Sequence, residues 1–341
     1  MTDPLNPSRI METGMAFWPS QVLLTAVKLG VFTALGGGAM SGQALADAVG
    51  LHESRTWDFL DTLVALQFLE REGSGRYAVY RNTKDTAAFL DRSKPDYLGG
   101  ILEMAHDRLY ADWSRLIEGL RNGEAQAQSK GNAQATFDAL YADRQRLEQF
   151  ISAMTSVQRR SFTSLAEAYD FSRHRHLCDI GGSEAALSVA IVSRYPQLEC
   201  SSLDLPAVEP VARQAVEKAG LTGRITLLSG DFFADPFPAA DVITMGNILH
   251  DWGLEQKKLL IRKAYEALPA DGVYIVVESI IDDERRHNAH GLMMSLNMLI
   301  ETGSGFNFTG RDFACWCEEA GFRRTEVRPL IGPSSAAIAY K

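Results

Sequence analysis

One histidine and two carboxylates have the residue types and spacing best suited to proton transfer. His250 and Asp251 stand side by side a few residues after an apolar run that reads as a strand, and Glu278 ends another such run. A histidine near neutral pH can take a proton from a hydroxyl, a step that contributes roughly 10²- to 10⁴-fold in rate. A carboxylate at the same sheet edge can hold the imidazole and stabilise its charged form. We therefore predict that His250 is a base and that Glu278 orients it.

A second group of residues indicates a nucleoside pocket. Residues 176–188 read as a strand, a tight glycine turn and a helix, the arrangement that places a helix amino terminus against a ligand. Asp204 ends the next strand 22 residues after Gly182, where an acid commonly holds ribose hydroxyls. Asp231 and Phe232 follow a third strand and could take the adenine amino group and its face. Each marker alone is weak, but together they predict an adenosine-containing ligand.

The elements that must position these residues alternate between strands and helices. Helices are predicted between the strands, and the alternation indicates a parallel, doubly wound sheet. Two further strand-like runs, 324–330 and 336–340, are joined by a loop too short for a parallel crossover, so they form an antiparallel hairpin. The predicted strands are 177–180, 200–203, 225–228, 242–245 and 273–278, and the predicted helices are 185–195, 207–219 and 254–268.

The first part of the chain is predicted to be mostly helical. The helix over 18–35 is so apolar that a partner helix from a second subunit is expected to cover it. Helices over 41–49 and 54–67, followed by a two-stranded wing over 68–80, form a winged helix. The second of these helices carries one Arg against two Asp, which disfavours DNA binding.

Two longer helical stretches are predicted next, separated by a polar break. They cover 97–121 and 135–169, and the break covers 122–132. Most of their aromatic and methionine side chains are expected in the core. Phe150 and Met154 are instead predicted to form an apolar wall of a substrate pocket.

Composition and charge limit the partners. The chain has 341 residues with 46% hydrophobic and 23% charged content, and its net charge of -9 makes nucleic acid an unlikely main partner. The 4 cysteines include no CxxC pair and no metal-ligand spacing, so we expect reduced thiols, no metal and a cytoplasmic location. Neither a signal pattern nor an apolar run long enough to span a bilayer is present, so no membrane association is expected.

Five motifs in a fixed order carry a family resemblance. They are SLDLP (202–206), GDFF (230–233), LHDW (249–252), ALPADG (267–272) and EAGF (319–322). From about residue 18 to the end, the chain resembles the two-domain, S-adenosylmethionine-dependent small-molecule O-methyltransferases. This family includes plant caffeic acid and acetylserotonin methyltransferases and bacterial antibiotic-tailoring enzymes. The resemblance implies a winged-helix dimerisation domain, placed at 1–170, and a Rossmann-like class I catalytic domain, placed at 171–341. It also implies a homodimer. The cofactor would be S-adenosylmethionine, and its product S-adenosylhomocysteine.

The resemblance assigns roles to individual residues. His250 would be the base, Glu278 would flank it, and Asp251 would lie beside the acceptor. Phe306 is also expected to line the acceptor pocket. The predicted cofactor contacts are Asp179, Gly181, Gly182, Ser183, Asp204, Leu205, Gly230, Asp231, Phe232 and Asn247, and the predicted acceptor contacts are Met154, Trp252, Met294, Met298 and Asn307.

Three positions depart from the family pattern. The cofactor loop is usually DxGGGxG, whereas here Ser183 and Ala185 replace two glycines that let the backbone approach the ligand. Gly246 stands where the family often has a lysine. Asn307 falls on a second glutamate that flanks the histidine, and an amide cannot compensate an imidazolium charge. The base hypothesis therefore depends mainly on Glu278.

The sequence thus predicts methyl transfer to a hydroxyl of a small aromatic or polyketide-like acceptor in secondary metabolism. One alternative is transfer to carbon or nitrogen, where a base is less needed. Another is a methyltransferase fold repurposed for a pericyclic or hydroxylation step, which the altered loop motivates. A nicotinamide oxidoreductase is disfavoured because GxGxxG is missing, and a winged-helix transcription factor is disfavoured by charge.

Overall fold

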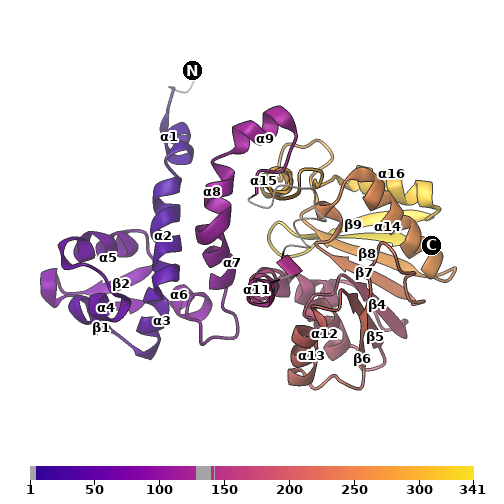
Figure 1. The fold of residues 1–341 in the computed structure, drawn as a ribbon, viewed down its shortest axis with the longest axis horizontal. Helices are drawn as coiled ribbons and strands as arrows, with labels where there is room; N and C mark the ends of the chain where they lie inside the picture. Colours follow the sequence, from indigo (N-terminus) through magenta and orange to yellow (C-terminus); the bar gives the residue numbers. More distant parts are fainter. Residues whose placement is uncertain (1–4, 128–139, 142) are drawn as a thin grey trace. The chain divides into compact units, whose positions relative to one another are not determined.

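The chain divides after Tyr110 into two units in the computed structural model, which describes residues 5–127, 140–141 and 143–341 (Figure 1). The sequence predicts the boundary after residue 170, but the structure places 111–170 with the second unit. The physical reason is helix α11 (Arg144–Ala168), which packs along α12 (Ala186–Arg194) and against strand β8 (Val273–Glu278). That helix is part of the second unit's core.

A seven-stranded sheet forms the centre of the second unit, in the order β6-β5-β4-β7-β8-β10-β9. The first five strands in this order are parallel, and β10 runs antiparallel to both β8 and β9. The predicted parallel sheet and carboxyl-terminal hairpin are therefore confirmed. The remaining strands are β4 (His176–Ile180), β5 (Glu199–Asp204), β6 (Ile225–Ser229), β7 (Val242–Gly246), β9 (Arg324–Pro329) and β10 (Ser335–Tyr340).

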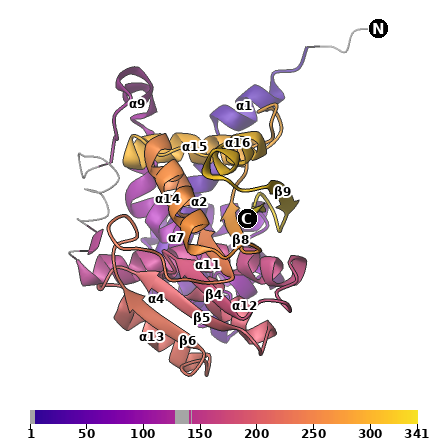
Figure 2. The same ribbon diagram turned by 90° about the vertical axis from the view of Figure 1, so that its right-hand side faces the viewer.

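Helices cover both faces of this sheet, because its central strands are apolar on both sides. On β8, Val273, Ile275 and Val277 pack into the cluster that includes α11 and α12, whereas Tyr274 and Val276 pack into the opposite cluster. The first cluster also includes α13 (Glu209–Lys218). The opposite cluster includes α14 (Leu254–Ala267) and α16 (Gly310–Ala320), as Figure 1 and Figure 2 show.

Some helices on both sides of the division after Tyr110 differ from their predicted ranges. The helix predicted over 135–169 is observed as α11, which begins after the N-cap Asp143, while 135–139 and 142 lie outside the described residues. The predicted run 97–121 is wrong as one helix and is split into short pieces. These pieces are α7 (Gly99–Met104), a π-helical turn (Ala105–Leu109), α8 (Tyr110–Trp113) and α9 (Leu116–Asn122). Helix α15 (Ala289–Thr302) carries the predicted methionines, and α16 was not predicted.

The first unit contains the predicted helix, turn, helix and wing, with an additional strand. Its strands pair in the order β1-β3-β2, and β1 is too short to show a periodic pattern. The single helix predicted over 18–35 is wrong, because Gly30 adopts a left-handed φ of 77° and ends α2. The elements are α1 (Ser8–Gly14), α2 (Phe17–Leu29), α3 (Val31–Ala34), β1 (Met40–Ser41), α4 (Gly42–Val49), α5 (Thr56–Ala65), β2 (Leu69–Glu72), β3 (Val79–Asn82) and α6 (Lys84–Phe89).

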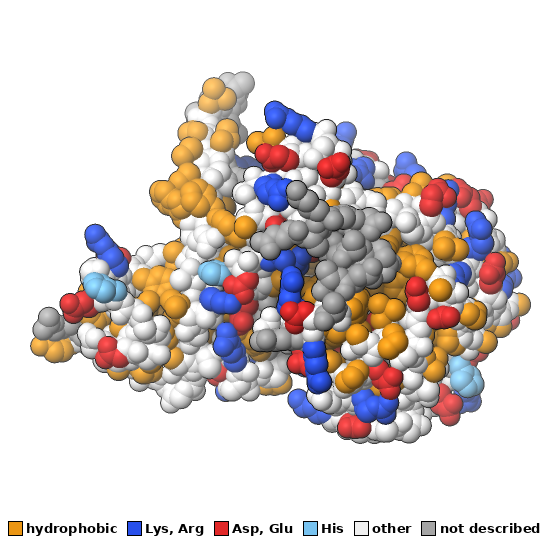
Figure 3. All heavy atoms as spheres, viewed as in Figure 1, with side chains coloured by type: hydrophobic (Ala, Val, Ile, Leu, Met, Phe, Trp, Pro, Cys, Tyr) orange, Lys and Arg blue, Asp and Glu red, His pale blue; other side chains and the backbone are white. Residues whose placement is uncertain are grey.

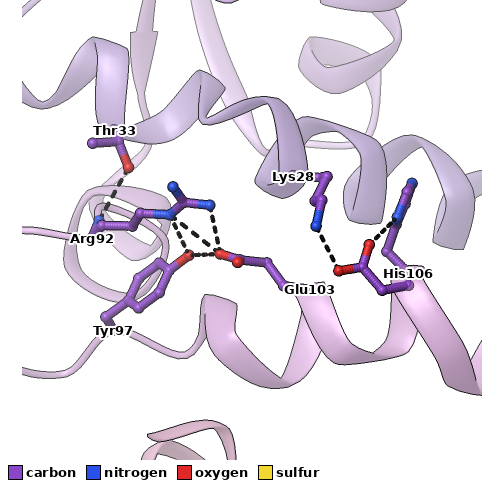
Figure 4. A network of polar contacts seen from close by, with 7 residues as sticks. Lys28, Thr33, Arg92, Tyr97, Glu103 and His106 are labelled. Carbon is purple, nitrogen blue, oxygen red and sulfur yellow. Dashed lines mark hydrogen bonds and ion pairs between the residues drawn. The ribbon is translucent and has the colours of Figure 1, made fainter. Parts of the chain in front are cut away.

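Polar contacts tie the π-helical turn and α7 to the rest of the first unit (Figure 4). The Arg92 guanidinium and the Tyr97 hydroxyl both donate to Glu103 Oε1, at 2.8 and 2.6 Å. Lys28 of α2 bridges to Asp107 at 2.5 Å. These contacts fix the π-helical turn beside α2.

The start of the first unit presents an apolar surface. The later part of α2 is buried in the unit's own core, but Phe17 and Trp18 are 48% and 62% exposed. Ile10 and Met11 of α1 are also exposed, and Figure 3 shows apolar side chains gathered over this part of the unit. A contiguous exposed apolar patch of this kind marks an interaction surface. Among the described residues no single helix meets the criteria for a membrane span, although α1 and α2 together with the bent segment 31–37 do.

Candidate functional site

The carboxyl ends of the five parallel strands bring the predicted site residues to one edge of the sheet. Gly181 follows β4, Asp204 ends β5, and Gly230 follows β6. Asn247 follows β7, and Glu278 ends β8. Ligands of such sheets bind at this edge, so the fold supports the predicted location of the site.

The loop between β4 and α12 keeps a glycine-type backbone even where glycine is missing. Gly181 has a φ of 69°, and its two replaced neighbours, Ser183 and Ala185, have φ values of 51° and 62°. A non-glycine residue in this left-handed region costs roughly 1–2 kcal/mol. The loop therefore preserves its conformation at an energetic cost.

Glycine itself is required at two positions of this loop. A Cβ on Gly181 would lie 2.4 Å from Ile248 Cδ1, and one on Gly182 would lie 2.1 Å from Ser202 Oγ. Glu184, in the same loop, faces helix α11, where it hydrogen-bonds Thr155 and lies near the charge of Arg159; burial raises the pKa of its carboxyl. Glu184 is thus engaged by protein groups.

Asp204 anchors the loop to the end of β5. Its carboxylate accepts hydrogen bonds from the backbone N–H groups of Ser183 and Leu205, at 2.8 and 2.7 Å. Burial raises the pKa of Asp204 to about 6, although these two hydrogen bonds oppose the shift. A carboxylate has about four acceptor positions, so two remain for a ligand hydroxyl.

Asp179 supports the loop from below rather than lining an open surface. It is 1% exposed, and its two oxygens accept from Ser188 Oγ and Thr244 Oγ1, both at 2.9 Å. Burial raises the pKa of Asp179 to about 6. Its direct contact with the cofactor stays a prediction, and its observed contacts are structural.

The loop after β6 is held in part by its own side chains. Asp231 accepts from the backbone N–H of Phe233 at 2.8 Å, which leaves its second oxygen without a hydrogen bond in the described structure. Lys263 of α14 donates to the carbonyls of Phe232, Phe233 and Asp235. The Phe232 ring lies 3.8 Å from the Cβ position of Gly181, so this loop and the glycine loop are neighbours.

The His250 ring lies between two carboxylates just after β7. Its Nδ1 is 3.2 Å from Glu278 Oε2, and its Nε2 is 3.5 Å from Asp251 Oδ1. The backbone N–H of His250 also donates to Glu278 Oε1 at 3.2 Å. Neither Nδ1 nor Oε2 forms a hydrogen bond within the described residues, so the two atoms lie close to each other without being aligned as donor and acceptor. The sequence therefore located the three groups that the fold brings together.

Burial dominates the ionisation of this cluster. Burial, together with the positive charge of Lys257, lowers the pKa of His250 to about 3. It raises the pKa of Glu278 to about 8 and the pKa of Asp251 well above its ordinary value. All three groups are therefore biased toward their uncharged forms.

The predicted acceptor residues differ in their burial. Met154 and Met294 are half-buried, but Met298 is only 6% exposed. Trp252 is also 6% exposed, and its ring packs edge-on against Phe233 with a centroid distance of 4.6 Å. The observed contacts of Trp252 are therefore core contacts, and its role toward an acceptor stays a prediction.

Two departures from the family pattern have structural reasons. A Cβ on Gly246 would lie 2.8 Å from the ring of Phe162, so α11 fills the space that a lysine would need. Asn307 is 2% exposed and donates from Nδ2 to the Ser279 carbonyl at 3.2 Å, while its Oδ1 makes no hydrogen bond within the described residues. Asn307 thus holds the backbone next to Glu278.

Sequence reasoning missed several residues of the site. A Cβ on Gly305 would lie 2.6 Å from the carbonyl oxygens of both His250 and Asp251. Burial raises the pKa of Tyr141, and the nearby charges of Asp204 and Asp251 raise it further. Lys257 is fully buried on α14. Only Lys257 left a signal, because helical spacing places it on the apolar face of α14.

Comparisons with known proteins agree with this geometry. Residues 113–323 match the O-methyltransferase domain, and residues 11–92 match the O-methyltransferase dimerisation domain. The chain is 37% identical over 335 residues to the tetracenomycin polyketide synthesis 8-O-methyl transferase TcmO of Streptomyces glaucescens, covering 98% of this chain and 97% of that protein. It is 30% identical over 326 residues to the N,N-dimethyltransferase OxyT of Streptomyces rimosus, covering 94% and 93%.

A solved structure extends the likeness to the whole fold. The crystal structure of human N-acetylserotonin methyltransferase in complex with S-adenosylmethionine matches with a TM-score of 0.91 at 29% identity, covering 100% of this chain and 99% of that one. Both units of the present chain therefore have counterparts in that protein.

Proposed function

The chain belongs to the S-adenosylmethionine-dependent O-methyltransferase family, and from this premise we propose that it methylates a hydroxyl of a small aromatic polyketide with His250 as general base. The observation that carries the proposal is the burial of His250 between Glu278 and Asp251, at the sheet edge that also holds the glycine loop. The predicted family, fold class and cofactor are confirmed by the comparisons.

The residues at this edge fit the cofactor. Gly181 and Gly182 leave a cradle that a Cβ would fill, and Ser183 keeps the backbone conformation that a glycine would adopt. Asp204 has free acceptor positions for ribose hydroxyls, and Asp231 with Phe232 would hold the adenine. When bound there, S-adenosylmethionine supplies an activated methyl group.

His250 would act on the acceptor hydroxyl. A neutral imidazole can accept the hydroxyl proton, and burial keeps His250 neutral at physiological pH. Glu278 would then stabilise the imidazolium through Nδ1, with Asp251 beside Nε2. The remaining contribution of the site is to hold the acceptor in the reactive orientation.

The acceptor class follows from the relatives and the lining residues. The name of TcmO describes 8-O-methylation in the synthesis of the polyketide tetracenomycin. The half-buried Met154 and Met294, together with Phe306, would offer an apolar surface to a flat aromatic ring. We therefore propose a phenolic acceptor of this kind.

The first unit would form the homodimer. Residues 11–92 match a dimerisation domain, and the exposed side chains of Ile10, Met11, Phe17 and Trp18 are the surface that a second copy would cover. Equilibrium sedimentation of the wild type should therefore report a dimer, and Trp18→Asp should shift it toward monomer.

The proposed reaction is tested with purified protein, S-adenosylmethionine and a panel of phenolic naphthoates and anthraquinones. Mass spectrometry should detect one O-methylated product together with S-adenosylhomocysteine. His250→Ala should lower kcat by roughly 10²- to 10⁴-fold while calorimetric binding of S-adenosylhomocysteine is retained. Normal turnover by His250→Ala would exclude the base role.

Nitrogen transfer is a second candidate, because OxyT is described as an N,N-dimethyltransferase. An amine acceptor that is already deprotonated needs no base. His250→Ala would then retain most of its activity toward amine analogues of the same acceptors. Paired hydroxyl and amine substrates therefore discriminate between the two reactions.

A further inference from the structure

Lys257 occupies a position where the fold calls for an apolar residue. It lies in the first turn of α14 and shares a buried face with Leu260, Ile261 and Ala264, at helical spacing. The residue is 0% exposed, although lysine is almost never fully buried without a partner. Its neighbour Lys258 instead points outward and bridges to Glu319 at 2.7 Å.

The contacts of the Lys257 ammonium are a carbonyl and aromatic rings. Nζ donates to the backbone carbonyl of Trp252, and it lies 3.8 Å from the ring centroid of Phe306 and 5.9 Å from that of Phe308. Within the described residues no carboxylate lies within ion-pair distance of this nitrogen. Lys257 therefore anchors the turn that carries His250 while its charge is not neutralised by direct contact.

Several ionisable groups face this charge from the elements around it. Asp251 lies on the same turn as His250, and Glu278 lies at the end of β8. The negative charge of Glu301 on α15 raises the pKa of Asp251. Tyr141 and Tyr274 are nearby phenols whose pKa values burial raises, so they stay neutral. Burial lowers the pKa of Lys257 itself to about 8, so the ammonium is present at pH 7. Its charge opposes the rise in the pKa values of Asp251 and Glu278 and adds to the fall in the pKa of His250.

The proposed base needs such a charge. For His250 to accept a proton while Glu278 stabilises the product, His250 must be neutral and Glu278 must be a carboxylate. That state of the pair carries one negative charge in a buried environment, which burial alone disfavours. A buried ammonium close by favours this state over the one in which Glu278 is also protonated.

We propose that Lys257 is a positioning residue of this site, whose ammonium anchors the His250 turn through the Trp252 carbonyl and favours the carboxylate form of Glu278 beside a neutral His250. This inference rests on the proposed role of His250 as base. Because the effect is electrostatic, its signature is a displaced pH profile rather than a uniform loss of activity.

The test compares Lys257→Met with the wild type and with Lys258→Met as matched control. Methionine has similar length and suits the apolar face of α14. In the wild type, kcat should rise with pH as Glu278 becomes a carboxylate. Removal of the Lys257 charge should move this rise to a pH about one unit higher, so that activity at pH 7 falls about tenfold and recovers at high pH. Lys258→Met should overlay the wild type.

A second variant separates the charge from the hydrogen bond. Lys257→Gln is uncharged, but its amide can still donate to the Trp252 carbonyl. It should shift the pH profile as Lys257→Met does. A profile that overlays the wild type in Lys257→Gln would overturn the electrostatic role.

A readout without turnover completes the experiment. The ring nitrogens of His250, identified by difference with His250→Gln, can be followed by nuclear magnetic resonance as pH is varied in the S-adenosylhomocysteine complex. The titration that they report should move upward in Lys257→Met. If His250→Ala stays active, the proposed function fails; if His250→Ala is inactive but Lys257→Met neither shifts the profile nor this titration, only the present inference fails.

Discussion

The two sides of the site are held in different ways. On the cofactor side, the backbone forms most of the site. Gly181 and Gly182 leave the space that a Cβ would fill, and the backbone N–H groups of Ser183 and Leu205 donate hydrogen bonds to Asp204. On the acceptor side, buried ionisable side chains surround His250 at 3.2 and 3.5 Å. A backbone-held site depends on conformation, whereas a side-chain-held site depends on charge.

This difference explains why the departures from the family pattern have unequal consequences. Ser183 replaces a glycine and still adopts its left-handed conformation, so the cradle survives. Asn307 replaces a glutamate and removes a negative charge from a buried cluster, which leaves Glu278 as the carboxylate at Nδ1. Substitutions on the acceptor side should therefore change rates and pH dependence, and those in the cofactor loop should mainly change stability.

The largest effect is expected for Glu278→Gln. The amide keeps the shape of the side chain but cannot stabilise an imidazolium, so kcat should fall by roughly 10³- to 10⁴-fold, as when the orienting acid of a catalytic triad is replaced. Calorimetric binding of S-adenosylhomocysteine should persist. The exposed Glu255→Gln on α14 serves as control. Near-normal turnover in Glu278→Gln would mean that the acceptor side is not held by charge.

A smaller loss is expected when the backbone of the acceptor side is displaced. In Gly305→Ala the added methyl would lie 2.6 Å from the carbonyl oxygens of His250 and Asp251, which cannot move independently of their turn. A displacement near 1 Å can cost about 10²-fold in rate. Gly223→Ala, which has open space around its Cβ, should be silent in the same kinetic assay. Equal kcat values in the two variants would refute this prediction.

Stability should depend on pH through the acceptor side. The pKa of Glu278 is raised from 4.5 to about 8, so the folded state holds an extra proton in this window and stability falls as pH rises through it. His250, Asp179 and Asp204 add little to the pH dependence of stability above pH 6.5. The pKa of His250 is lowered and those of Asp179 and Asp204 are near 6, so these groups are mostly deprotonated in both the folded and the unfolded state there.

Urea unfolding of the cofactor-free protein should therefore lose about 1–2 kcal/mol between pH 6.5 and 8. In Glu278→Gln this slope should be shallower, and what remains comes from Asp251, whose pKa burial also raises. Parallel curves for the two proteins would show that Glu278 does not carry the extra proton.

The smallest effect is expected in the cofactor loop. Ser183→Gly relieves a φ of 51°, and the lost hydroxyl makes no hydrogen bond in the described structure, so stability should rise by about 0.5–1 kcal/mol. Calorimetry should show a gain of a few degrees in Tm. Ser193→Gly, in the exposed part of helix α12, should instead lower stability by about the same amount. A lower Tm for Ser183→Gly would contradict the strain.

Much of the site could be predicted because its residues follow buried strands. Asp204, His250 and Glu278 come at or just after the carboxyl ends of apolar runs, and parallel strands bring those ends to one edge. The break at Gly30 and the short strand β1 could not be predicted. A glycine inside an apolar helix pattern and a two-residue strand leave no periodic signal.

The sequence by itself determined the fold class, the residues at the carboxyl ends of the parallel strands and the identity of the His250 cluster. Local periodicity and the order of the motifs record these features. Tertiary structure alone decided that Lys257 is buried beside the cluster and that Gly305 lies against its backbone. It also decided that Ser183 adopts a left-handed conformation. These properties arise when segments distant in the chain exclude water and restrict one another, and no local pattern encodes that packing.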